Sequence, residues 1–309
     1  MYAQLPVIRR YGEAAVAAAA AAIRGGGIVA LPSETVYGLA ADARDSDAVA
    51  RIYAAKGRPS FNPLIVHVPD LAAAAAIAVF DEDARALAAR FWPGPLTLVL
   101  PLREGAGIAS LVTAGLETVA IRVPAHRAFR AVLAACGAPL AAPSANASNG
   151  ISPTRAGHVA ASLGERVPLI LDDGATAAGV ESTILAGRTI LRPGPVTAEM
   201  LAQVLPVMPG RTAHVSAPGQ LAVHYAPSKP VRLGATSACE GEWLIGFGDV
   251  AGDDTLSASG DVVEAAARLF DALHRGDASD RTAIAVAAVP AVGVGVAIND
   301  RLRRAAGAE

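Results

Sequence analysis

The chain of 309 residues has few cysteines, few aromatic side chains and almost no net charge. Its two cysteines, Cys136 and Cys239, lie far apart and neither forms a Cys-x-x-Cys pair, which argues against a disulfide framework or a structural zinc site. Aromatic residues make up only 4% of a composition that is 53% hydrophobic, so we expect a core of aliphatic side chains. A formal net charge of -2 argues against a broad basic surface for nucleic acid, and phosphate recognition would need a few well-placed cations.

Membrane and export signals are also lacking. No run reaches the roughly 18 apolar residues, free of charge and turn signals, that indicate a membrane span. Arg9 and Arg10 before the alanine-rich stretch 14–23 superficially resemble an export signal, but Glu13 interrupts it and alanine is a weak substitute for a leucine-rich core. Because alanine is the best helix former, we expect an opening amphipathic helix in a cytoplasmic protein.

Several familiar catalytic motifs are missing. The sequence contains no GxxxxGK[ST] phosphate loop, no HExxH, no GxSxG and no kinase set. The fragment Gly293-x-Gly295 is too short to be more than a turn. A nucleotide would therefore have to be bound by another kind of site.

Apolar periodicity alternates between helical and strand spacing along the chain. Helices are expected at 14–23, 46–56, 81–91, 126–135, 262–274 and 296–306. Strands are expected at 28–31, 64–68, 96–100, 118–123, 140–142, 182–185, 189–192, 231–233, 243–247 and 284–289. The hairpin at 182–192 among helices indicates an α/β chain of the α+β type with a mixed sheet. Aperiodic residues 206–230 predict a linker between a domain at 1–205 and a small βαβ-type domain at 231–309.

The loop after the second expected helix carries two cations. Lys56 and Arg58 stand two residues apart, and Pro59 and Pro63 stiffen the loop, so the charges are held with little ordering cost. Arginine offers a planar fork for phosphate oxygens, whereas lysine acts as a point charge. The alternative is solvent-facing charge that interacts with the dipole of the helix C-terminus.

Two strands place polar groups on a face opposite to their apolar residues. In 64–68, strict alternation puts His67 with Ile65 on one face, where a histidine is usually a satisfied core group. In 118–123, Arg122 shares a face with Thr118 and Ala120. A buried arginine needs an anion, which is either a protein carboxylate or a bound ligand.

Two further loops are rich in polar groups. Residues 141–150 run from a strand into hydroxyl and amide side chains that can donate to phosphate, although a plain Asx or Ser turn has the same composition. Glu181-Ser182-Thr183 opens the expected hairpin and Arg192-Pro193-Gly194 closes it. In an isolated hairpin these would be ordinary turn residues.

Six segments occur in order and together closely resemble the YrdC-like threonylcarbamoyl-AMP synthase family. They are Pro32-Ser33-Glu34-Thr35-Val36-Tyr37-Gly38-Leu39, Lys56-x-Arg58, Asn62-Pro63-Leu64, Trp92-Pro93-Gly94-Pro95-Leu96-Thr97, Pro143-Ser144-Ala145-Asn146 and Glu181-Ser182-Thr183. The resemblance covers about residues 8–205, and His224-Tyr225-Ala226-Pro227 is similar to the longer, two-domain branch. Ser33 departs from the threonine more common at its position but keeps the hydroxyl. The small domain is matched mainly by Asn299-x-x-Leu302-x-x-Ala305-Ala306.

The resemblance implies a large, twisted YrdC-like mixed sheet with a concave positive face, followed by a small C-terminal Rossmann-like α/β domain. It implies that L-threonine is held by Thr35, His67, Arg122, Ala142 and Ser182. It implies that ATP is held by Arg58, Asn62, Thr118, Ser144, Asn146, Ser152 and Arg192, with Tyr225 closing over it from the linker. Lys56 and Arg58 are the residues expected to serve catalysis directly.

The implied reaction joins L-threonine, bicarbonate and ATP into threonylcarbamoyl-AMP and pyrophosphate, for the N6-threonylcarbamoyladenosine of tRNAs that read ANN codons. Mg²⁺ is expected with the ATP on chemical grounds, and no tightly bound organic cofactor or protein metal site is expected. The expected partners are a downstream tRNA threonylcarbamoyl transferase complex and a weak tRNA or double-stranded RNA contact, with no membrane.

Two rival functions are weaker. One is carbamoyl-adenylate formation, as in related hydrogenase-maturation proteins. Those proteins carry an acylphosphatase-like domain and cysteine-rich zinc motifs, which this sequence lacks. A pure RNA-binding module is disfavoured by the near-neutral charge.

Overall fold

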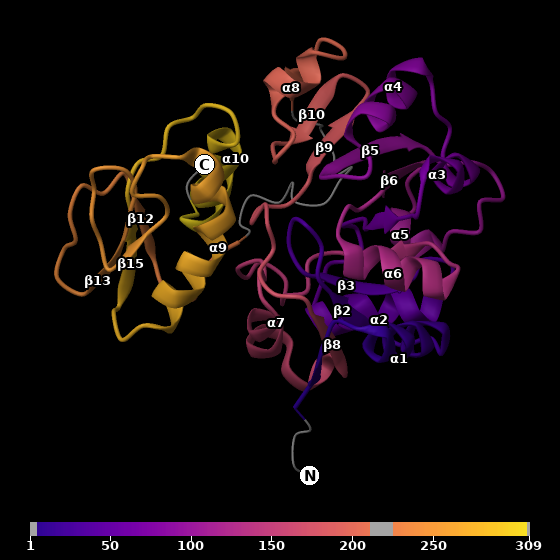
Figure 1. Cartoon of the computed structure of the whole chain (residues 1–309), viewed down its shortest axis with the longest axis horizontal. Coiled ribbons are helices and arrows are strands. Elements are labelled where there is room, and N and C mark those ends of the chain that lie inside the picture. The colour runs from indigo at the N-terminus through magenta and orange to yellow at the C-terminus, as the bar shows by residue number, and fades with distance from the viewer. Residues whose placement is uncertain (1–4, 211–224, 308–309) are drawn as a thin grey trace.

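The computed structural model describes residues 5–210 and 225–307, which form a large and a small domain side by side (Figure 1). The large domain is built on an 11-stranded sheet. In spatial order its strands are β1 (Val7–Arg10), β8 (Leu169–Asp172), β2 (Val29–Leu31), β3 (Gly38–Asp42), β7 (Leu140–Ala141), β4 (Ile65–His67), β6 (Thr118–Arg122), β5 (Leu96–Pro101), β9 (Thr183–Ala186), β10 (Thr189–Arg192) and β11 (Met208–Pro209). Parallel pairs such as β4–β6 alternate with antiparallel pairs such as β5–β6 and β9–β10, so the predicted mixed sheet is confirmed.

Helices cover both faces of this sheet. They are α1 (Glu13–Arg24), α2 (Ser46–Lys56), α3 (Leu71–Ile77), α4 (Glu82–Phe91), α5 (Ser110–Thr113), α6 (Arg127–Cys136), α7 (Ala156–Leu163), the 3₁₀ turn η1 (Gly164–Arg166) and α8 (Ala198–Ala202).

The boundaries of α2 follow from the residues at its two ends. The Asp45 carboxylate accepts from the backbone N–H groups of Asp47 and Ala48, and Gly57 ends the helix in the left-handed conformation at φ 61°.

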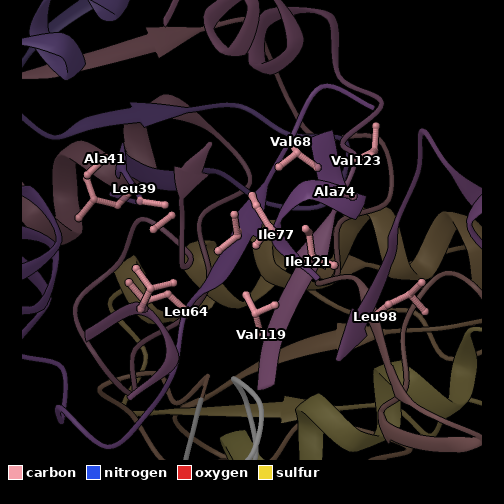
Figure 2. Close-up of a cluster of buried hydrophobic side chains, with 14 of the residues drawn as sticks. Leu39, Ala41, Leu64, Val68, Ala74, Ile77, Leu98, Val119, Ile121 and Val123 are labelled. Carbon is pink, nitrogen blue, oxygen red and sulfur yellow. The ribbon is translucent and has the colours of Figure 1, made fainter. Parts of the chain in front are cut away.

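The alternation predicted for β4 and β6 is confirmed. Leu64 and Val68, and likewise Val119, Ile121 and Val123, belong to the main buried cluster on one face of the sheet (Figure 2). Val66 belongs to the same cluster. His67 and Arg122 lie on the opposite face, and the register pairs them directly across the two parallel strands. One face of these central strands therefore supplies the core, and the other supplies polar groups.

Some helices and strands of the structure were not predicted from the sequence pattern. The strand β3 has the sequence Gly-Leu-Ala-Ala-Asp, without a β-branched or aromatic residue, yet it pairs with β2 and β7. Strands β1 and β8 and helices α3 and α7 were likewise not expected from the pattern. Whether such a segment forms a strand depends on its pairing partners, which strand propensity does not encode. The strand expected at 284–289 ends at Val286.

The small domain has a parallel sheet in the order β12 (Val231–Leu233), β15 (Ala283–Val286), β13 (Glu242–Gly246) and β14 (Asp254–Thr255). Its helices α9 (Val262–Ala278) and α10 (Gly295–Ala305) confirm the expected βαβ arrangement and lie toward the large domain in Figure 1. Of the linker predicted at 206–230, residues 211–224, including His224, lie outside the described residues. No helix in the described ranges is long and apolar enough to cross a membrane.

Candidate functional site

A pocket opens on the polar face of the central strands. Its wall is formed by the loop 33–38, by β4 and β6, by the loop 142–144, by residues 181–182 and 192 at the ends of the β9–β10 hairpin, and by Tyr225. About 560 Å³ of empty space, part of it continuous with solvent, lies within this wall. Small-molecule sites are commonly of this order of size.

Arg122 is the central cation of the pocket. Its Nη1 donates to Thr35 Oγ1 at 3.1 Å and its Nε to the Gly94 carbonyl at 3.1 Å. Its Nη2 lies 2.6 Å from Oε1 of Glu34. Burial raises the pKa of the Glu34 carboxyl, but the charge of Arg122 and its hydrogen bond lower the pKa by more, so Glu34 stays ionised. The structure thus supplies Arg122 with a protein carboxylate, the partner that the strand pattern left open.

The segment that carries Thr35 is a tight, buried turn. Ser33 Oγ donates to the Val36 carbonyl at 2.6 Å and accepts from the backbone N–H of Thr35 at 3.1 Å. The Ser33 and Thr35 hydroxyls are 2.9 Å apart. This side-chain turn fixes the Thr35 hydroxyl in the pocket, and it needs only the hydroxyl that Ser33 retains.

His67 is a buried imidazole in the pocket wall. Its ring centroid lies 4.8 Å from that of Phe129, and its Nδ1 has no hydrogen-bond partner within residues 5–210 and 225–307. Burial and the nearby charge of Arg122 lower the pKa of His67 to about 3. At neutral pH the ring is uncharged and can exchange a hydrogen bond with a small polar ligand.

Ser182 and Arg192 form a further part of the pocket wall. Arg192 donates from Nε to the Ser182 carbonyl and from Nη2 to Ser182 Oγ, each at 3.0 Å. The Ser182 hydroxyl also lies 2.8 Å from Thr97 Oγ1. These contacts hold a buried guanidinium at the pocket without a salt bridge to a carboxylate among the described residues.

Arg58 is the third arginine of the wall and is half-buried. Its Nε donates to the Asn62 carbonyl at 3.0 Å and its Nη2 to the Pro63 carbonyl at 2.8 Å. Burial lowers the pKa of Arg58 to about 10, which leaves it charged at neutral pH. It too has no salt bridge within the described part of the chain. The side chain of Asn62 is buried, and the residue contributes its backbone carbonyl to holding Arg58.

Lys56 points to a loop rather than into the pocket wall. Its buried ammonium group donates to the carbonyl oxygens of Ser144, at 2.6 Å, and Asn146. Burial, and then the charges of Arg58 and Arg166, hold its pKa well below the ordinary value. Asn146 is buried as well and donates to the carbonyls of Ala147 and Gly150. The two side chains shape the loop that presents Ser144 to the pocket.

Glu181 brings a second carboxylate to the pocket wall. Its Oε1 accepts from Ser152 Oγ, and its Oε2 accepts from Nε of Arg301 at 2.9 Å. Burial raises the pKa of Glu181, but the charges of Arg301 and Arg192 lower it by more. Ser152 thus touches the pocket through Glu181.

Tyr225 covers the pocket from the end of the linker. It is buried, adopts a left-handed conformation at φ 65°, and its ring centroid lies 5.7 Å from that of Phe270 in α9. The next residue, Ala226, donates its N–H to the Asn149 carbonyl at 2.8 Å. This bridge anchors the described end of the linker to the loop of Ser144.

The structure therefore brings most of the sequence-predicted residues into one wall: Thr35, Arg58, His67, Arg122, Ala142, Ser144, Ser182, Arg192 and Tyr225. Five others lie outside it: Lys56, Asn62, Thr118, Asn146 and Ser152. Thr118 begins β6, on the face of Arg122 but about 13 Å away along the strand.

Three residues near the pocket were given no role from the sequence. Glu34 lay within a recognised motif, so a signal for it existed. Phe129 had none, because the apolar pattern of α6 explains its presence, and Arg301 had none, because its partner Glu181 lies 120 residues away in the sequence.

The electrostatic balance favours anions. Three arginines face the pocket, and the two carboxylates near it, Glu34 and Glu181, are each matched by an arginine. Two of the three wall cations, Arg58 and Arg192, are left to meet a charged ligand. No group of three His, Cys, Asp or Glu side chains in the described residues could hold a metal ion.

Comparisons with known proteins agree over the whole chain. The family model Sua5_yciO_yrdC, described as "Telomere recombination", matches residues 21–194, and the model Sua5_C, described as "Threonylcarbamoyl-AMP synthase, C-terminal domain", matches 196–307. The threonylcarbamoyl-AMP synthase of Bacillus subtilis is 41% identical, with 94% of this chain and 93% of that protein covered. The one from Pyrococcus abyssi is 39% identical, with 97% and 96% covered. The crystal structure of P. abyssi Sua5 complexed with L-threonine superposes with a TM-score of 0.89 at 37% identity, covering 98% of this chain and 97% of that one.

Proposed function

The chain belongs to the Sua5–YciO–YrdC family, in its two-domain form, and from that premise we propose that it is a threonylcarbamoyl-AMP synthase. As an adenylyl-transferring enzyme it would join L-threonine, bicarbonate and ATP into threonylcarbamoyl-AMP and pyrophosphate. The observation that carries this proposal is a pocket whose wall holds Arg122 together with two arginines, Arg58 and Arg192, that form no salt bridge among the described residues. One pocket can then take an amino acid and a triphosphate together.

The amino-acid half of the pocket would lie around Arg122. Its guanidinium is already oriented by Thr35 and Gly94. It would bind the threonine carboxylate in addition to its contact with Glu34. Nδ1 of the neutral His67 ring, which has no hydrogen-bond partner among the described residues, would meet the hydroxyl or amine of threonine. Ser182 and the backbone at Ala142 complete this half.

The nucleotide half would lie around Arg58, Ser144 and Arg192. The two guanidinium groups would take phosphate oxygens, and Tyr225 would cover the nucleotide from the linker. Asn62, Lys56, Asn146 and Ser152 would act from behind the wall, because their contacts hold Arg58, the Ser144 loop and Glu181. Thr118 would contact the nucleotide only at its outer end.

The chemistry would proceed in two steps. The threonine amine attacks bicarbonate to give a carbamate with loss of water, and a carbamate oxygen then attacks the α-phosphorus and displaces pyrophosphate. A carbamate decomposes in water, so the pocket must hold the reactants close and limit solvent. The fixed arginines would stabilise the charge that develops on the phosphoryl oxygens.

Magnesium would arrive with the nucleotide. The two carboxylates near the pocket are committed to Arg122 and Arg301, and the described residues offer no acidic cluster for a resident ion. Mg²⁺ bound to the triphosphate would neutralise the leaving pyrophosphate. The protein's part would be limited to the arginine contacts.

The product would be consumed by a tRNA threonylcarbamoyl transferase complex that forms N6-threonylcarbamoyladenosine in tRNAs reading ANN codons. We propose the cytoplasm as the place of this reaction and, at most, a weak direct contact with tRNA. The formal charge of -2 is consistent with delivery of a small molecule rather than with stable RNA binding.

The test is pyrophosphate release from ATP by the purified full-length chain, with the nucleotide product identified by mass spectrometry. Release should require both L-threonine and bicarbonate, and the product should carry the threonylcarbamoyl group. Release driven by carbamoyl phosphate instead would indicate the carbamoyl-adenylate reaction. Absence of ATP turnover, together with tight duplex RNA binding, would indicate a binding module.

A further inference from the structure

Arg301 is a completely buried arginine that the small domain brings to the pocket wall. It lies on α10, where its Nε donates to Glu181 Oε2 at 2.9 Å and its Nη1 to Asp300 Oδ2 at 2.7 Å. Its guanidinium carbon also lies 5.2 Å from the centroid of the Tyr225 ring. One side chain of the small domain therefore contacts two members of the pocket wall, Glu181 and Tyr225.

The buried carboxylate of Glu181 is neutralised by this contact with Arg301. Arg301 is its salt-bridge partner among the described residues, and Ser152 supplies the remaining hydrogen bond. The next residue, Ser182, receives both hydrogen bonds of Arg192. Without Arg301, a buried carboxylate would stand unneutralised beside Arg192 and beside the space where a triphosphate would bind.

The position of Arg301 is fixed by close packing between the domains. The core of the small domain includes Val36, Ile151 and Val180 of the large domain. At Gly179, a Cβ atom would lie 2.2 Å from the Ala266 carbonyl of α9, so the two backbones are in direct contact. Docking of the small domain and placement of the guanidinium are therefore one event.

We propose that Arg301 is a positioning residue through which the small domain completes the nucleotide half of the pocket. By neutralising Glu181 it leaves Arg192 available to phosphate, and by packing on Tyr225 it seats the ring that covers the nucleotide. The inference rests on the proposed function, because it takes ATP as the ligand. Its consequence is selective: Arg301 affects ATP, whereas the Arg122 half, which it does not contact, keeps its affinity for threonine.

The experiment measures equilibrium binding of ATP and, separately, of L-threonine to the full-length chain by calorimetry. Arg301→Met should raise the Kd for ATP by about tenfold or more, the effect of one unpaired buried charge facing an anion, and leave the threonine Kd within about twofold. Glu181→Gln combined with Arg301→Met removes both charges and should recover most of the ATP affinity. Arg303→Met, on the exposed face of the same helix, is the matched control and should bind both ligands as the parent chain does.

Two results would overturn the inference. One is unchanged ATP binding by Arg301→Met; the other is a parallel loss of ATP and threonine affinity that follows a fall in Tm, as a purely structural role predicts. If Arg301→Met does not fold, Arg301→Lys is measured instead. Lysine keeps the positive charge but loses the planar guanidinium, and the proposal then expects the same selective loss of ATP affinity. A parent chain that binds no ATP would overturn the proposed function and this inference with it, whereas a parent chain that binds ATP isolates the role of Arg301.

Discussion

Glu34 and Arg122 form a buried ion pair, with Oε1 and Nη2 2.6 Å apart, at the place where the threonine carboxylate is proposed to bind. The arginine is therefore neutralised before a substrate arrives, and it is held in place by Thr35 and the Gly94 carbonyl. A ligand carboxylate would join or replace Glu34 at the same guanidinium. Substitutions at this pair consequently affect folding and binding in separable ways.

Arg122→Leu should both destabilise the protein and weaken threonine binding. Removal of one partner leaves Glu34 buried and unpaired, which costs about 3–5 kcal/mol of folding free energy. The KM for threonine should rise by about two orders of magnitude or more, since a charge-assisted contact is lost. Thermal unfolding and steady-state kinetics measure the two effects.

The variant that also carries Glu34→Gln separates these effects. With both charges removed, the Tm should return close to that of the parent chain while the threonine KM stays high. A normal threonine KM in the stable double variant would remove the carboxylate contact from the proposal.

Arg58→Ala should abolish pyrophosphate release while leaving the fold intact. Arg58 is half-buried and forms no salt bridge among the described residues, so its loss strands no opposite charge. The Pro63 carbonyl loses its donor, but the Asn62 carbonyl keeps the Tyr53 hydroxyl, so the Tm should fall by only about 3 °C. Arg51→Ala, on the exposed side of α2, serves as the control, and unchanged turnover in Arg58→Ala would refute the assignment of this arginine.

Lys56→Met should lower stability and activity together. The substitution removes the donor of two hydrogen bonds and leaves the part-buried carbonyl of Ser144 and the buried carbonyl of Asn146 unsatisfied, at up to about 1–3 kcal/mol for each group. Circular dichroism on heating and pyrophosphate release measure the two properties. A variant with the parent Tm but no activity would instead give Lys56 a direct part in the chemistry, as the sequence motif predicts.

Stability should fall as the pH drops from about 6.5 to about 4, the interval between the ordinary histidine pKa and the folded-state pKa of His274. Burial lowers the pKa of His274 to about 4 and that of His67 to about 3. Within this interval the unfolded chain binds protons that the folded chain does not. Each histidine should therefore remove up to about 2 kcal/mol at pH 5.

His274→Gln tests the sign of this dependence. His274 stacks on His158 with ring centroids 3.8 Å apart, and its Nε2 lies 3.2 Å from the Ser152 carbonyl, a contact that glutamine can preserve. Denaturant unfolding at pH 5 and pH 7.5 should show a smaller loss for the variant. Equal losses in both proteins would contradict a neutral buried His274.

Local chemistry made part of this structure predictable. The alternation that places His67 and Arg122 opposite the core requires only neighbouring residues, and the structure shows it. The strand β3 was missed for the complementary reason. Its composition is poor in strand formers, and its pairing with β2 and β7 provides the stabilisation that its side chains do not.

The sequence by itself determined the helices of ten residues or more, the mixed character of the sheet and the set of polar residues that could meet in one site. Only the tertiary structure decided which charges pair: Arg122 with Glu34, Lys56 with the loop of Ser144, and Arg301 with Glu181 from 120 residues away. The physical reason is the distance along the chain over which each effect acts. Backbone propensity and side-chain periodicity act over a few residues, whereas a buried charge is stabilised by whichever opposite group the packed domains bring within about 4 Å.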